Sequence, residues 1–294
     1  MKAFLVTIII SLLALSSTAQ IAGNQLYGKN SHHNYNIISN TEPKIVASEK
    51  NVTFTVDVLM NAKPDFFKVV LGAHQEGKTV IECNDKINER IEGLKKSLKR
   101  LNITEKDIYV DFITQNKIYD YQLNQNVAEQ IDMGYEIKKN IIIEFNDISI
   151  FDELVSISAS HSIFDIIKVD YFNTDQVKIY DQLFEACLKV VDRKKNMYEK
   201  YMDLTLSKRF SIVSENSSCI MPKIQYRDYK AFEASDVSTY NTYNKMVKKD
   251  LRKRATFFYE GTDISRFDHT INPEMVDIPI QYALRLKLSF RINE

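Results

Sequence analysis

Residues 280–292 restrict the fold most strongly, because they place an apolar side chain at every second position without interruption. The apolar members are Ile280, Tyr282, Leu284, Leu286, Leu288, Phe290 and Ile292. A period of two directs one set of side chains to each face of a β-strand. The pattern therefore predicts a half-buried strand, and the chain must build a sheet with one covered face.

Several other segments also have strand character. Residues 52–58 and 67–73 alternate on either side of a turn at Asn61–Asp65, and Pro64 in that turn has no amide to donate to a ladder. These two segments predict a hairpin. Further strands are expected at residues 108–112, 135–145, 163–172, 210–213 and 220–229. We expect the polar stretch 124–132 to link two of them, residues 148–162 to form a short helix, and Pro222 to interrupt the last strand.

Two segments have helical periodicity. Between residues 80 and 101, apolar side chains recur at steps of three and four, and Asn102 is the expected end of that helix. Asp175 is the expected cap of a second helix. The apolar stripe predicted for the second helix is Val177, Tyr180, Phe184, Cys187, Val191, Tyr198 and Met202. These elements predict an α+β fold, in which a largely antiparallel sheet carries two long amphipathic helices packed on it.

The N-terminus predicts export. Lys2 precedes an apolar run at residues 3–15 and small residues at 17–19, which is the pattern of a signal peptide over residues 1–19. The run is too short for a membrane span and no comparable run follows, so we expect no transmembrane segment in the mature chain. The predicted location is periplasmic or extracellular. The alternatives are an N-terminal helix of the folded domain or an uncleaved anchor.

The rest of the chain divides by composition. Residues 20–50 are polar and aperiodic and are expected to form a flexible leader. Residues 51–294 are expected to form one domain, with an insertion at about residues 230–275. Within the insertion lies a basic stretch that is the candidate surface-binding site. Its members are Lys245, Lys248, Lys249, Arg252, Lys253 and Arg254. A solvated helix face is the alternative interpretation of this stretch.

No pattern in the sequence predicts a reaction. Lysine plus arginine and aspartate plus glutamate each number 39, so no net charge recruits nucleic acid. The common nucleophile, dinucleotide, phosphate and metal motifs are missing, so we expect no catalytic residue, cofactor or metal ligand. Cys83 and Cys187 are expected to be buried small hydrophobes. The alternative is that one pair of cysteines forms a disulfide bond. Asp263 and Asp268 are expected to be solvated.

Five short motifs follow one another along the chain, at Ala62–Asp65, residues 98–108, Gly134–Ile137, residues 186–195 and residues 278–290. In this order they resemble the SIMPL-domain family, which is common among bacterial envelope proteins. The turn Ala62–Asp65 is similar to the family's A-x-P-D turn, and residues 98–108 are similar to its helix exit. Gly134–Ile137 resembles its G-Y strand, residues 186–195 its long second helix, and residues 278–290 its final strand. The departures are Asn102 in place of a glycine, few alanines in the second helix, and a longer 230–275 stretch.

The resemblance implies an exported non-enzymatic envelope protein that acts by self-assembly or protein binding. Some members of the family assemble into rings and others are linked to oxidative-stress defence, and none supplies an active site to transfer. The expected partner is a second copy of the chain or an envelope protein. The alternatives are a periplasmic small-molecule or peptide-binding module and a hydrolase with an unrecognised site.

Overall fold

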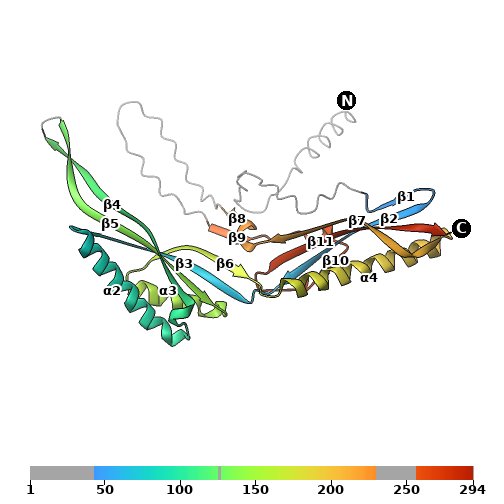
Figure 1. Ribbon diagram of the computed structural model, residues 1–294, viewed down its shortest axis with the longest axis horizontal. Coiled ribbons are helices and arrows are strands. Elements are labelled where there is room, and N and C mark those ends of the chain that lie inside the picture. Colours follow the sequence, from blue (N-terminus) through green and yellow to red (C-terminus); the bar gives the residue numbers. More distant parts are fainter. Residues whose placement is uncertain (1–42, 125–126, 230–255, 294) are drawn as a thin grey trace, which may run out of the picture. The chain divides into compact units, whose positions relative to one another are not determined.

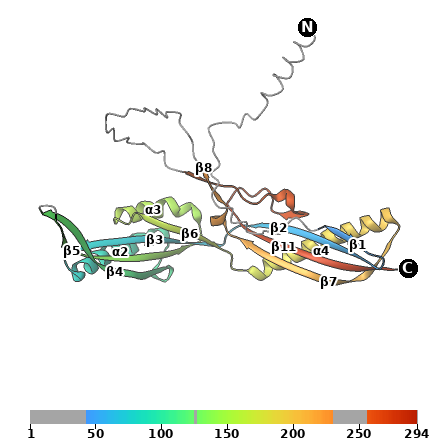
Figure 2. The same ribbon diagram turned by 90° about the horizontal axis from the view of Figure 1, so that it is seen from above.

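The computed structural model describes residues 43–124, 127–229 and 256–293 (Figure 1 and Figure 2). Contacts within the chain separate these residues into two units. The larger unit contains residues 43–223 and 263–293, and the smaller unit contains residues 224–229 and 256–262. Among the described residues, no helix is both long enough and apolar enough to cross a membrane.

The first sheet of the larger unit is built around β2 (Asn51–Ala62) and β11 (Ile280–Asn293), which pair antiparallel. The order is β1-β2-β11-β7, with β1 (Ile45–Ala47) and β7 (Thr205–Ile220) also antiparallel to their neighbours. The short β10 (His269–Ile271) pairs with β2 in parallel. β1 falls within the segment for which we expected a flexible leader. The strand predicted at residues 280–292 is confirmed.

Helix α4 (Gln176–Met202) covers one face of this sheet. It begins where the Asp175 carboxylate accepts a hydrogen bond from the Lys178 amide at 2.9 Å, as predicted. The side chains of α4 that are buried against β2 and β11 are Ile179, Leu183, Ala186, Cys187, Val190 and Val191. The predicted stripe was therefore wrong at its ends, where Val177 is 72% and Met202 57% exposed. The buried stripe passes instead through Ile179 and the small Ala186, which lets the helix approach the sheet.

The second sheet has the order β4-β5-β3-β6, and all of its pairs are antiparallel. Its strands are β3 (Phe66–Gly77), β4 (Ile108–Asn124), β5 (Val127–Phe145) and β6 (Asp165–Phe172). Helices α2 (Val80–Leu98) and α3 (Phe151–Ser160) bury their apolar side chains in one core with β3 and β5. We expected one sheet that carries both long helices, whereas α2 and α4 pack on different sheets.

The end of α2 explains one departure from the family pattern. The short 3-10 turn that follows α2 ends at Asn102, whose φ of 60° lies in the left-handed region. Glycine enters this region without steric cost, and asparagine is one of the few other residues that does so readily. Asn102 therefore fills the role of the glycine that it replaces.

The strand boundaries differ from the prediction at residues 124–132 and agree with it at Pro222. Residues 124–132 were predicted to be a link, but β4 and β5 extend through almost all of them. The side chains of residues 128–132 are exposed, and the sequence of residues 124–132 lacks the alternation that identifies a half-buried strand. The break at Pro222 is confirmed, because β7 ends at Ile220 and the next strand, β8 (Tyr226–Tyr229), pairs with β9 (Thr256–Tyr259) in the smaller unit. The α+β class and the largely antiparallel pairing are also confirmed.

Candidate functional site

The predicted basic site at residues 245–254 lies outside the described residues. Within the described part of the chain, two surfaces of the larger unit combine exposed charge with apolar contact area. One is a groove between α4 and β10, and the other is the outer part of the β4–β5 hairpin. The sequence patterns predicted neither surface as a site.

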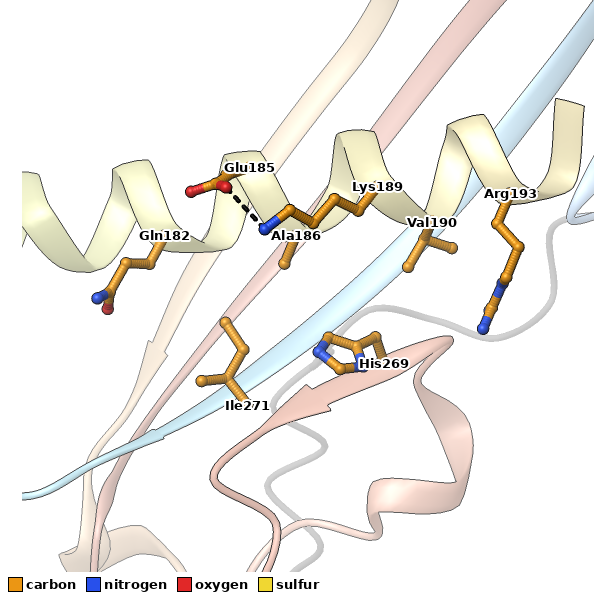
Figure 3. A pocket seen from close by; sticks show the side chains of 8 residues that line it. All are labelled: Gln182, Glu185, Ala186, Lys189, Val190, Arg193, His269 and Ile271. Atoms are coloured by element: carbon orange, nitrogen blue, oxygen red, sulfur yellow. Dashed lines mark ion pairs between the residues drawn. The ribbon is translucent and has the colours of Figure 1, made fainter. Parts of the chain in front are cut away.

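The α4 groove is the space between helix α4 and strand β10, with a volume of about 460 Å³. Its floor is apolar and consists of Ala186, Val190 and Ile271. Its polar rim consists of Gln182, Glu185, Lys189, Arg193 and His269. Figure 3 shows Gln182 and Arg193 reaching down from the helix, while His269 and Ile271 come from β10 on the opposite side. The groove therefore offers an apolar floor between polar walls.

The width of the groove is set by Asp268, the residue just before β10. Its amide donates to the Asp57 carbonyl at 2.8 Å, and its carboxylate accepts from the Asp57 amide at 2.9 Å. The same carboxylate accepts from Lys194 of α4 at 2.6 Å. Asp268 thus links β2, β10 and α4. We expected this residue to be solvated, but its side chain is only 14% exposed, so that expectation was wrong.

The electrostatics of Asp268 follow from these contacts. Burial alone would raise the pKa of its carboxyl group, but hydrogen bonds from Lys194 and the Asp57 amide, together with the charges of Lys194 and Lys44, outweigh burial and hold the pKa below its ordinary value. The carboxylate is therefore charged at neutral pH, as the Lys194 contact requires. Asp263, the other acid considered, is exposed and accepts a hydrogen bond from the Ser265 amide, as a turn residue does.

A second carboxylate, that of Asp57 on β2, completes this network. Asp57 is 1% exposed, and Arg285 of β11 donates to both of its oxygens, at 2.6 and 3.0 Å. Lys44, just before β1, contacts both Asp57 and Asp268. Three cations thus surround two carboxylates, with each oxygen accepting at least one hydrogen bond. This arrangement is a structural clamp, because its acids are already occupied by charged donors.

The charge of the groove itself is concentrated at one end. Lys189 pairs with Glu185 at 2.7 Å, so these two charges compensate each other (Figure 3). Arg193 is exposed and has no hydrogen-bond or ion-pair partner within the described part of the chain. Its guanidinium carries five N–H donors in a planar arrangement that suits a carboxylate. The groove can therefore accept an apolar group flanked by an acid.

The β-arm, defined as residues 116–124 of β4 and 127–134 of β5, is the second surface. The pairing of β5 with β3 ends at Tyr135 and Gly77, so the β-arm pairs with no third strand among the described residues. Figure 1 shows β4 and β5 continuing together beyond the end of β3. An isolated two-stranded ribbon is marginally stable in water and gains from a partner. The β-arm therefore lies outside the core of its sheet.

Gly134 is the residue that lets the β-arm leave the sheet. Its φ is +113°, and a Cβ atom built on it would lie 2.3 Å from the Gly77 carbonyl oxygen. Only glycine fits such a close backbone approach at a positive φ. The Gly134–Tyr135 motif was recognised in the sequence by resemblance, and this contact gives its physical reason.

The two faces of the β-arm differ in chemistry. Directly paired residues of an antiparallel ribbon share a face, as do residues two apart. The tyrosine face contains Tyr119, Tyr121 and Gln130, with Asp132 paired to Lys117 at 2.6 Å. The acidic face contains Asp120 opposite Ile131, and Gln122 opposite Glu129. The carboxylates of Asp120 and Glu129 are exposed and form no ion pair with any described residue.

The three cysteines are free thiols that offer no competing site. Cys83 and Cys187 are free thiols buried in the two cores, as predicted, and burial raises the pKa of Cys187 to about 12, which disfavours its thiolate at neutral pH. Cys219 is also a free thiol, and burial raises its pKa too. Among the described residues, no group of three histidine, cysteine, aspartate or glutamate side chains is placed to hold a metal ion.

A protein-family model matches most of the chain. The family model described as "SIMPL: Protein of unknown function (DUF541)" matches residues 52–255, which is more than half of the chain. The match covers the β-arm, α2, α3, α4 and β7. No curated protein matches the sequence.

Proposed function

Since this chain belongs to the SIMPL family, whose function is unknown, we propose that it is an exported, non-enzymatic protein that acts by self-assembly through the β-arm. One observation carries the proposal. The β-arm extends beyond the sheet with large apolar side chains exposed, including Tyr121 at 66% and Tyr119 at 49%. Exposed apolar area on an element outside the core is characteristic of a protein contact surface.

Removal of the β-arm tests this proposal. Residues 119–133 would be replaced by an Asn-Gly turn, so that the paired residues Ile118 and Gly134 flank a two-residue hairpin loop. We expect the shortened chain to keep its circular dichroism spectrum and thermal midpoint, and to elute as a single protomer in light-scattering chromatography where the parent chain assembles. A shortened chain that assembles like the parent would overturn the proposal.

Export is supported by the sequence of residues 1–19. Expression of the full chain in a bacterial host, followed by cell fractionation and mass spectrometry, tests it. We expect the product outside the cytoplasm, with an N-terminus near Gln20. A cytoplasmic product that begins at Met1 would contradict export. A role in stress defence rests on the family resemblance alone.

A binding module for a small molecule or peptide is the second candidate, and the α4 groove favours it. An apolar floor with Arg193 free to bind a carboxylate suits a small carboxylate with an apolar body. Titration with benzoate, followed by thermal shift, tests this candidate. A shift that disappears in Arg193→Gln would support it, and no shift at saturating benzoate would count against it.

A further inference from the structure

We propose that the acidic face of the β-arm of one copy binds in the α4 groove of a second copy. This inference rests on the proposed self-assembly and names the two surfaces that meet. The acidic face and the groove are different surfaces of the chain, so the contact is head-to-tail. A head-to-tail contact leaves one free β-arm and one free groove in every open assembly.

The apolar parts of the two surfaces are complementary. The floor of the groove is made of Ala186, Val190 and Ile271, which present aliphatic carbon without a polar group. On the acidic face of the β-arm, Ile131 is an exposed aliphatic side chain that projects from the ribbon. Insertion of Ile131 between α4 and β10 would remove apolar surface of both copies from water.

The charges are complementary as well. Residues 116–134 contain three acidic residues and a single lysine, and that lysine is already paired with Asp132. This leaves Asp120 and Glu129 uncompensated, and both lie on the face that carries Ile131. In the groove, Arg193 is the charge that has no ion-pair partner among the described residues. Opposite charges on two surfaces favour their encounter and fix the orientation in which they bind.

The spacing of the charges also matches. Asp120 and Glu129 are diagonal neighbours across the ribbon, with Cα atoms about 7–8 Å apart. Lys189 and Arg193 are four residues apart on α4, with Cβ atoms about 5–6 Å apart. The side chains of lysine and arginine are long enough to make up the difference between these two spacings. Each carboxylate can therefore reach one of the two cations. In such a complex, Lys189 would leave its exposed ion pair with Glu185 and form an ion pair with a carboxylate of the other copy.

Mixing two variants tests the contact. Arg193→Glu reverses the charge of the groove and keeps the β-arm intact, and Asp120→Lys/Glu129→Lys reverses the acidic face and keeps the groove intact. We expect each variant alone to associate at least about tenfold more weakly than the parent chain. Each variant retains the surface that the other has lost, and the two reversed surfaces are again opposite in charge, so a mixture should associate more strongly than either variant alone.

Lys178→Glu is the matched control, because it makes the same charge change on α4 outside the groove. We expect it to assemble like the parent, and circular dichroism should show that every variant is folded. Unchanged assembly of folded Arg193→Glu, or a mixture that stays monomeric, would overturn the inference while the self-assembly proposal stands. A parent chain that is always monomeric would overturn both, and loss of benzoate binding in Arg193→Glu without loss of assembly would assign the groove to a small ligand instead.

Discussion

At the scale of single residues, substitution of Gly134 gives the clearest prediction about stability. Replacement by alanine would force a Cβ atom against the Gly77 carbonyl oxygen at a positive φ. We expect Gly134→Ala to lower the free energy of unfolding by about 2–4 kcal/mol, measured by chemical denaturation. Asn102→Gly is the control, because it places glycine in a left-handed position that already exists, and it should change stability by less than about 0.5 kcal/mol. An equally stable Gly134→Ala would contradict the close approach.

Asp268 gives a prediction on pH. A carboxyl group whose pKa is lower in the folded chain than in the unfolded chain contributes stability that is present above the unfolded value, near 4, and is lost as the pH falls through the folded value. Asp268→Asn should therefore lower stability by about 1–3 kcal/mol at neutral pH. The difference between Asp268→Asn and the parent chain should shrink below about pH 4. Denaturation curves across this pH range measure it, and a difference that grows on acidification would refute the assigned contacts.

At the scale of elements, helix α4 shows what periodicity can predict and what it cannot. The sequence places the helix and its Asp175 cap correctly, because capping and apolar spacing are local properties. Its buried stripe depends on the sheet beneath it, and the ends of the helix extend where large apolar side chains such as Val177 meet solvent. The charge network of Asp57, Asp268 and Lys194 was not predicted either. Its members are distant in the sequence, and only the parallel pairing of β10 with β2 brings them together.

The orientation of α4 can be measured directly. Leu183 is buried against the sheet, whereas Val177 is exposed. Leu183→Ala should cost about 2–4 kcal/mol of unfolding free energy, because it leaves a cavity in the core. Val177→Ala should cost less than about 0.5 kcal/mol. Equal costs for the two variants would show that the helix presents a different face to the sheet.

In contrast to α4, the β-arm is an element that the sequence pattern did not predict. Residues 124–132 are mostly polar and show no alternation of apolar and polar side chains, so they were predicted to be a link. Its role follows from the point where β3 ends and from the positive φ of Gly134. Salt should weaken a contact that uses its acidic face. We expect assembly to decrease as sodium chloride is raised, and an increase would favour the tyrosine face.

At the scale of the whole molecule, local patterns predicted the α+β class, and the motifs identified the family that the family model confirms. The division of the strands into two sheets was not predicted, because it depends on which strands pair rather than on where they lie. The candidate site was not predicted for the same reason. The groove requires α4 beside β10, and the β-arm requires β5 to continue past β3.

Self-assembly through the β-arm is the central claim, and sedimentation velocity tests it most directly. The sample is the chain without residues 1–19, compared over a range of concentrations with the same chain carrying the shortened hairpin. We predict that the parent chain sediments as species larger than a protomer whose share grows with concentration, and that the shortened chain sediments as a protomer throughout. A parent chain that stays a protomer at every concentration, or a shortened chain with the same distribution as the parent, would contradict the claim.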